Sequence, residues 1–137
     1  MKFSEIEAEQ WDELKPYVDT CLLPITGLDG TETPSEATNY LEQLRDVMDL
    51  VEIPYRGRIV TYPAYHYVYG NEGSQQAIAR CCANLKSQGY KYIILITSKS
   101  DIMFQINEAD LWIAPTEDGN LPSDVEISRK IRELWHS

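Results

Sequence analysis

Residues 91–98 read KYIILITS, an apolar run in which hydrophobic and polar residues hardly alternate. A strand with one face in water alternates apolar and polar side chains, whereas a strand buried on both faces is apolar throughout. Strands of the second kind are typical of parallel sheets, because crossover helices cover both faces of such sheets. The run therefore predicts a central strand of a parallel, helix-covered sheet.

Three further runs rich in β-branched and aromatic residues are typical of strands. They are YVDTCLLPI at 17–25, GRIVTYP at 57–63 and ADLWIAP at 109–115. Stretches with the apolar spacing of helices lie between most of them, and strands that alternate with helices predict βαβ units. We therefore expect an α/β fold: a three-layer α/β/α single domain over residues 1–137, with a mostly parallel sheet of four to five strands.

Four helix starts are marked by capping residues. A Ser or Thr followed three residues later by Glu predicts a capping box, in which each side chain satisfies a backbone amide of the other residue. Such pairs, or a single capping serine, stand at the start of the stretches with helical spacing. The residues are Ser4 with Glu7, Thr33 with Glu36 beside Pro34, Ser74 with Gly89 at the far end of its helix, and Ser123 with Glu126.

Residues 101–107, DIMFQIN, fit two structures equally well. The apolar residues Ile102, Phe104 and Ile106 alternate with their neighbours as they would in a strand. The position between two predicted strands suits a short connecting helix just as well. The sequence leaves both alternatives open.

The composition restricts the classes of partner. With 12 Lys and Arg against 22 Asp and Glu, the formal net charge is −10 and the isoelectric point is about 4.5. Nucleic-acid affinity comes mostly from cations that meet phosphates, so this balance argues against a nucleic-acid partner and against docking on an anionic membrane. The longest uninterrupted apolar run, residues 93–96, is too short to cross a bilayer.

The N-terminal stretch and the cysteines indicate the cell compartment. MKFSEIEAEQW carries acids where a secretory signal has an apolar core. Cys21, Cys81 and Cys82 are odd in number and form no C-x-x-C pair, which favours neither a disulfide framework nor a zinc site. We interpret Cys81 and Cys82 as core residues of a helix. We expect a cytoplasmic protein with reduced thiols, without a metal or another cofactor.

The carboxyl ends of the predicted strands are where a functional site is expected. In an open parallel sheet, ligands bind at this edge, beside the point where the strand order reverses. The loops that follow the strands gather there, and they are residues 26–35, 64–74, 98–101 and 116–123. The polar and aromatic residues that these loops carry are Asp29, Glu32, Tyr65, His66, Tyr67, Tyr69, Ser98, Lys99, Asp101, Glu117 and Asp118.

A phosphate or nucleotide site is the first hypothesis for this edge. Helices that begin after Thr33 and Ser74 would present free amides and a positive dipole end. However, the loop GLDGTETPS contains no lysine and is not a P-loop, and the chain has no G-x-G-x-x-G. Asp29 and Glu32 would also repel a phosphate unless a metal bridged them. Helix initiation explains the loop without a ligand.

A divalent cation such as Mg²⁺ is the second hypothesis. Hard cations prefer carboxylate oxygens, and the gathered loops contain several. Their spacing follows no dedicated motif such as the EF-hand, and scattered surface carboxylates are expected in a chain this acidic. No metal ligand is therefore assigned. The carboxylates are Asp29, Glu32, Asp101, Glu117 and Asp118.

Residues 62–69 hold four tyrosines and one histidine. His66 is a candidate general base, with Ser98 or Ser100 as its candidate partner, although no G-x-S-x-G marks either serine. A packed, hydrogen-bonded histidine is the alternative interpretation. A tyrosine offers a large area with a polar tip, so the cluster fits a pocket wall or a partner interface as well as simple packing. The candidate interface residues are Tyr65, Tyr67 and Tyr69.

The order and character of the strands resemble a known family. YVDTCLLPI, GRIVTYPAYHYV, KYIILITS and LWIAP, taken in this order, are similar to the YpiF-like proteins, a family of small, uncharacterised cytosolic proteins from Bacillus and related Firmicutes. The resemblance covers nearly the whole chain and rests on the strands rather than on a catalytic signature. It implies a cytosolic location and assigns no activity or catalytic role to any residue.

The sequence favours a non-catalytic protein, because the predicted edge lacks a complete catalytic constellation. We expect an accessory or protein-interaction module that meets a partner protein, or a second copy of itself, through the loops at the carboxyl edge. The alternative is an enzyme or sensor that binds a small molecule or nucleotide at the same edge, with or without Mg²⁺. The candidate ligand-binding residues are Asp29, Glu32, His66, Ser98 and Asp101.

Overall fold

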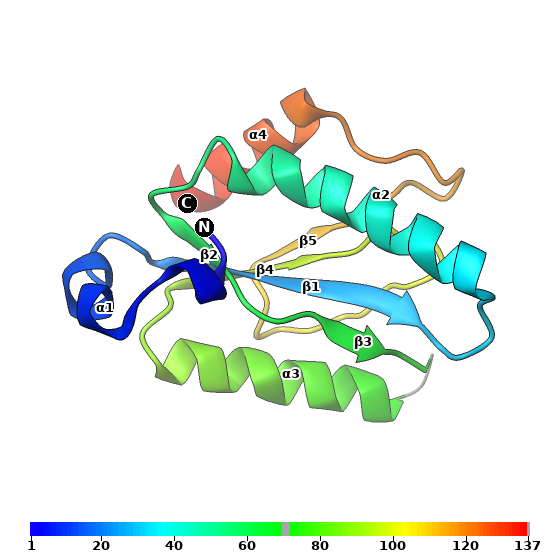
Figure 1. Ribbon diagram of the computed structural model, residues 1–137, viewed down its shortest axis with the longest axis horizontal. Helices are drawn as coiled ribbons and strands as arrows, with labels where there is room; N and C mark the ends of the chain where they lie inside the picture. The colour runs from blue at the N-terminus through cyan, green and yellow to red at the C-terminus, as the bar shows by residue number, and fades with distance from the viewer. Residues whose placement is uncertain (70–71, 137) are drawn as a thin grey trace.

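A computed structural model describes residues 1–69 and 72–136 (Figure 1). In these residues a five-stranded sheet lies between two layers of helices, and every strand pair is parallel. The predicted α/β fold, three-layered with a mostly parallel sheet, is confirmed. The elements are η1 (Phe3–Glu5), α1 (Ala8–Leu14), β1 (Thr20–Leu28), α2 (Pro34–Glu52), β2 (Ile59–Thr61), β3 (Tyr65–Tyr67), α3 (Glu72–Ser87), β4 (Tyr92–Ile96), β5 (Leu111–Ile113) and α4 (Asp124–His136).

The central strand β1 is buried along its whole length. The strand order is β2-β1-β4-β5, and Leu22 of β1 lies opposite both Thr61 of β2 and Ile94 of β4. Strand β4 is also buried at every position. Its residue Ile93 enters the core on one face of the sheet and Ile94 enters the core on the other. The prediction of a strand covered on both faces is therefore confirmed.

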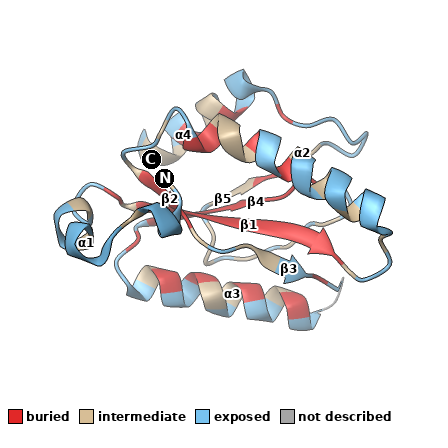
Figure 2. Cartoon of the chain, viewed as in Figure 1, coloured by how far each residue is buried: buried red, intermediate tan, exposed pale blue. Residues whose placement is uncertain are grey.

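Each face of the sheet has its own helices (Figure 1). Leu44 of α2 and Ile131 of α4 share one core with Ile94. Ile78 and Cys82 of α3 share the other core with Ile93. Figure 2 shows the buried strands between helices whose outer sides are exposed. None of the helices in the described part of the chain has the length and apolar content that crossing a membrane requires.

The caps of α2 and α4 are formed as predicted. The Glu36 amide donates to Thr33 Oγ1 over 3.2 Å, and the Thr33 amide donates to Glu36 Oε1 over 3.0 Å, which completes the capping box. The Glu126 amide donates to the hydroxyl of Ser123 over 3.2 Å. Beyond α3, Gly89 has a φ of +114° and its amide donates to the Lys86 carbonyl, as a glycine cap does.

Two predicted helix starts are wrong. Ser4 lies in the short helix η1, and α1 begins later because Glu7 is itself the N-cap, in a reciprocal capping box with Gln10. Ser74 is not an N-cap either, since α3 begins at Glu72 and includes it. The Ser74 hydroxyl accepts a hydrogen bond from the Tyr69 amide over 3.0 Å, which ties the end of the preceding segment to the first turn of α3.

Residues 101–107 form neither a strand nor a helix, so both alternatives from the sequence are wrong. Parallel strands usually need a helical crossover, but here plain chain leads from β4 to β5. Ile102, Phe104 and Ile106 are partly buried while the residues between them are exposed. Their alternation therefore reflects packing against the core on the α3 face, to which Phe104 and Ile106 belong. Within the described residues, none of the amides of 100–106 donates a hydrogen bond, so no strand forms.

The segment that was expected to be a loop after β2 contains the extra strand β3. The Tyr62 amide donates to the Leu22 carbonyl, and the next donor along β1 on this side would be the amide of residue 24. That residue is Pro24, which has no amide, and Pro63 opposite it has none either. The ladder therefore stops after β2 and resumes where Ile25 lies opposite Tyr65.

Candidate functional site

The strand order places a reversal point at the carboxyl ends of β1 and β4. The chain leaves β1 to form β2 on one side of it and later returns to form β4 on the other side. The loops after β1 and β4 therefore leave two adjacent strands and separate from each other. Open parallel sheets bind ligands at such a point. Two of the four loops that the sequence assigned to this edge thus lie next to each other.

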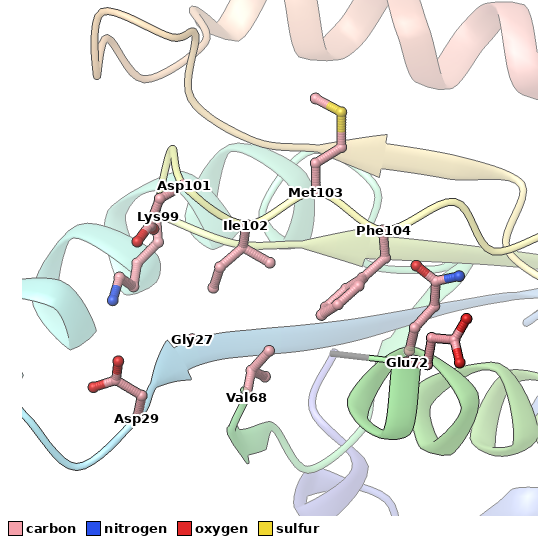
Figure 3. A pocket seen from close by; sticks show the side chains of 10 residues that line it. Gly27, Asp29, Val68, Glu72, Lys99, Asp101, Ile102, Met103 and Phe104 are labelled. Atoms are coloured by element: carbon pink, nitrogen blue, oxygen red, sulfur yellow. The ribbon is translucent and has the colours of Figure 1, made fainter. Parts of the chain in front are cut away.

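A cavity of about 520 Å³ opens at this point (Figure 3). Its walls come from the end of β1, the residue after β3, the first turn of α3 and the plain chain after β4. Figure 3 shows Ile102 and Phe104 directed toward β1, whereas Met103 points away from it. The lining residues are Gly27, Asp29, Val68, Glu72, Gln75, Lys99, Asp101, Ile102, Met103 and Phe104.

Lys99 is the basic residue of this cavity, and its side chain is only 10 % exposed. Its ammonium lies 3.6 Å from Glu32 Oε2 and 4.9 Å from the centre of the Tyr40 ring. The glycine at position 27 makes this placement possible, because it has a φ of +74° and a Cβ there would lie 2.9 Å from Lys99 Cδ and would also collide with Ile102. Because Gly27 has no side chain, the end of β1 leaves room for the side chain of Lys99.

The acidic residues of the loop after β1 have different roles. Glu32 accepts hydrogen bonds from the amides of Asp29 and Gly30 over 3.1 Å each, so it closes its own loop. Asp29 Oδ1 accepts from the Thr31 hydroxyl over 2.6 Å and from the Thr31 amide over 3.0 Å. These hydrogen bonds lower the pKa of Asp29, and Lys99 contributes in the same direction. Figure 3 shows Asp29 and Lys99 directed toward one another.

This arrangement leaves little for a phosphate at the start of α2. The amides that a phosphate would use are taken by carboxylates of the chain itself, because Glu32 holds those of Asp29 and Gly30 while Glu36 holds that of Thr33. Nor do three or more His, Cys, Asp or Glu side chains converge as metal ligands in the described part of the chain. The loop is built for helix initiation.

The structure brings together only part of the predicted ligand-binding set. Asp29 and Asp101 line the cavity, and Glu32 reaches it through Lys99. Ser98 does not line it, because its hydroxyl donates to the Tyr40 carbonyl of α2 over 2.9 Å. His66 lies elsewhere, in a hollow of about 290 Å³ between α2 and the segment joining β2 to β3. The grouping of His66 with the loop carboxylates is therefore not found.

The predicted interface tyrosines also separate. Tyr65 is half-buried and packs against the core on the α3 face. Tyr67 and Tyr69 are 59 % and 53 % exposed. They lie on either side of Val68, which lines the cavity. Two of the three tyrosines are therefore accessible, next to a cavity wall.

The sequence placed Lys99 at this edge but did not include it among the candidate binding residues, and it did not place Phe104 there. Lys99 had a signal in the sequence, since it is the only lysine or arginine in the four loops assigned to this edge. A single cation among many acids at the end of a buried strand marks a candidate counter-charge. Phe104 had no such signal, because its place depends on the chain after β4 turning back over the sheet, where it packs edge-on against Trp112.

The fold and the cavity define an α/β domain with an open parallel sheet and a cavity at its carboxyl edge. The chain belongs to the family described as "Protein of unknown function (DUF2487)", whose model matches residues 9–122. All cavity-lining residues lie within this match. The expected membership of an uncharacterised family is confirmed at this level. Comparisons with curated proteins and with solved structures gave no match.

Proposed function

We propose that this protein is a non-catalytic binding protein that holds a small organic ligand in the cavity at the carboxyl edge of its sheet. The observation that carries the proposal is a cavity of about 520 Å³ at the strand-order reversal, with a nine-tenths buried lysine in its wall. Small-molecule sites typically have volumes of about 300–1,000 Å³. A mixture of charged and apolar walls at this position is what such a site needs.

Binding is better supported than catalysis. A general base has to reach the bound ligand, and the candidate base His66 lines a different hollow. A nucleotide held with Mg²⁺ has less support than an organic ligand without phosphate, because the amides before α2 already bind Glu32 and Glu36. We therefore assign the cavity an accessory or sensor role.

Native mass spectrometry of the protein purified gently from its own cells tests this proposal. We expect an added mass that matches a small molecule. Gln75→Trp fills the cavity wall from α3 and should abolish the added mass, whereas Gln76→Trp makes the same change at an exposed neighbouring position outside the cavity. An unliganded mass together with no response to a metabolite library would refute ligand binding.

Protein interaction through the same edge is the second candidate. Its support is the exposure of three large side chains in the segments around the cavity: Tyr67 at 59 %, Tyr69 at 53 % and Met103 at 76 %. Sedimentation equilibrium should show self-association that Tyr67→Ser weakens and that Tyr17→Ser, at a residue 73 % exposed in another part of the molecule, leaves unchanged. Monomers at all concentrations, without a copurifying protein, would argue against it.

The proposal includes a cytoplasmic location and the narrower resemblance to the YpiF-like proteins of Bacillus and related Firmicutes. The free thiols of Cys21, Cys81 and Cys82 support the cytoplasmic location. The net charge of the chain is −10. The same charge leaves nucleic acid and anionic membranes outside the proposed partners. Fractionation of cells that express the chain should place it with the cytosolic proteins.

A further inference from the structure

The ammonium of Lys99 has hydrogen-bond donors to spare. An ammonium offers three N–H donors, and a buried charge is costly unless hydrogen bonds satisfy it. Among the described residues, Lys99 Nζ makes no hydrogen bond, and its closest charged contact is Glu32 at 3.6 Å. Glu32 is already held by the amides of Asp29 and Gly30. The cavity therefore has a fixed place for an acceptor group from outside the chain.

The same cavity also presents unused acceptors. Within the described residues, the side-chain carboxylates of Asp101 and Glu72 take part in no hydrogen bond or ion pair, and both residues line the cavity. Asp29 accepts its hydrogen bonds through Oδ1 alone, so Oδ2 remains available. Asp29 and Asp101 lie at the same end of the cavity as Lys99, whereas Glu72 lies at the other end, beside Phe104 (Figure 3). Donor groups with a positive charge are favoured beside these carboxylates.

The third part of the cavity is apolar. Ile102 and Phe104 form a wall over the end of β1, and Val68 faces them from the other side (Figure 3). Phe104 is held edge-on against Trp112, with ring centres 6.3 Å apart. A hydrocarbon or aromatic group fits this part of the cavity.

The ammonium, the carboxylates and the apolar wall of the cavity together disfavour ligands that carry only a negative or only a positive charge. An anion alone satisfies Lys99 but meets the carboxylates of Asp29 and Asp101, while an amine or metal cation alone leaves the donors of Lys99 unused. We propose, on the basis of the binding function above, that the ligand is an ammonium carboxylate of the amino-acid class with an apolar side chain. Its carboxylate accepts from Lys99, its ammonium donates to Asp29 or Asp101, and its side chain lies against Phe104.

Calorimetric titration with matched probes tests this inference. We expect L-phenylalanine or L-leucine to bind at least about tenfold more tightly than the corresponding amine without the carboxylate, or the corresponding acid without the ammonium, which is a difference of about 1.4 kcal/mol or more. Lys99→Met should remove the advantage over the amine, because the carboxylate of the amino acid then has no ammonium to accept from. The double variant Asp29→Asn with Asp101→Asn should remove the advantage over the acid, because it neutralises both carboxylates that can accept from the ammonium.

Two control variants keep the charge change and move it away from the cavity. Lys91→Met and Asp118→Asn alter exposed residues that do not line it, so both should retain the wild-type preference. Equal affinity for the amino acid and either half-probe overturns the inference, as does the absence of binding up to about 10 mM, a limit that detects Kd values near 1 mM.

The failure of this inference differs from the failure of the proposed function. A ligand from cells that Gln75→Trp displaces, combined with no preference for amino acids, refutes the ligand class and keeps the binding function. No added mass, no response to the library and no binding of the probes refute both.

Discussion

An ion pair lies at each end of the parallel strands, which we call the amino edge and the carboxyl edge of the sheet, and the two pairs differ in their hydrogen bonds. At the amino edge, Asp19 and Arg58 form a bidentate ion pair, with Nε–Oδ1 at 2.9 Å and Nη2–Oδ2 at 3.1 Å. At the carboxyl edge, Lys99 and Glu32 form a single contact of 3.6 Å. Two hydrogen bonds join the first pair, whereas the ammonium of the second pair makes no hydrogen bond among the described residues and lies beside a cavity. One edge is built for stability and the other leaves room for recognition.

The amino-edge pair is part of a closed network. The Arg58 guanidinium lies 3.9 Å from the centre of the Trp135 ring, and the Trp135 indole donates to the Thr20 hydroxyl over 3.0 Å. That hydroxyl donates to Asp19 over 2.9 Å. The starts of β1 and β2 are thereby joined to the end of α4. Every polar group of the network has a partner within it.

The largest expected effect is at Trp135. Trp135→Ala removes the ring that Arg58 covers and that packs against Tyr55, with ring centres 5.1 Å apart in the wild type. It also leaves the Thr20 hydroxyl without its donor. We expect the free energy of unfolding in urea to fall by about 3 kcal/mol. Trp135→Phe, which keeps a ring but loses the hydrogen bond, should cost about 1 kcal/mol. Equal losses in both variants would contradict the role of the ring.

Gly27→Ala at the carboxyl edge is next. The new Cβ would collide with Ile102 and Lys99, in a backbone conformation that alanine rarely adopts. We expect a loss of about 2–3 kcal/mol in urea unfolding. Gly30→Ala, which has a φ of +94° but open space, isolates the backbone cost of about 1 kcal/mol, and Gly57→Ala, with open space and an ordinary φ, should be nearly neutral. If Gly27→Ala matched Gly30→Ala, the close approach of Lys99 would be refuted.

A smaller effect concerns the pH dependence of Asp19. Partial burial opposes its charged form, but the Arg58 guanidinium and the Thr20 hydroxyl outweigh this, so the pKa of Asp19 lies below its usual range. The pair therefore stabilises the fold fully above the unfolded pKa of about 3.9, and this contribution is lost as the pH falls through the folded pKa.

Comparison with Asp19→Asn measures this contribution. We expect the wild type to be more stable than the variant by about 1 kcal/mol at pH 7, because the pair is partly exposed, and the difference to shrink below pH 4. The same series with Asp46→Asn, at an exposed ion pair with Arg45, should show almost no difference at either pH. A gap for Asp19→Asn that stays constant down to pH 2 would contradict the ion pair.

The smallest effect on stability is expected at Lys99. Replacing one member of a buried ion pair is costly when the remaining charge is left unpaired. Here Glu32 keeps the amides of Asp29 and Gly30, so Lys99→Met should change the free energy of unfolding by less than about 1 kcal/mol. A loss near that of Trp135→Ala would show that the carboxyl edge is as structural as the amino edge.

Local chemistry predicted the caps of α2 and α4 and the buried strand β4, although similar signals at Ser4 and Ser74 do not start a helix. Thr33 and Glu36 cap α2 because both partners lie within one turn, and the apolar run of β4 needs only two covered faces. Features that depend on distant neighbours were not predicted. Phe104 and Ile106 alternate with exposed residues as in a strand, but they pack against the core on the α3 face without pairing with a strand.

The sequence predicted the edge of the sheet at which the cavity lies, but not all the residues that line the cavity. The loops after parallel strands gather at the carboxyl edge, and Asp29 and Asp101 line the cavity at that edge. His66 does not join them, because the resumed ladder of β3 turns it toward α2. The local sequence does not predict on which face of the sheet each side chain of a short strand lies.

The two prolines that interrupt the ladder beside β1 also protect the protein against aggregation. A long, regular edge strand is a template on which another chain can add itself. Pro24 and Pro63 divide this edge into strands of three residues each, β2 and β3. The amide of Thr61 in β2 is already used by the Met1 carbonyl over 2.7 Å. The strand on the other side of the sheet, β5, also has three residues. In the described part of the chain, the sheet therefore has no long edge strand to which another chain could add.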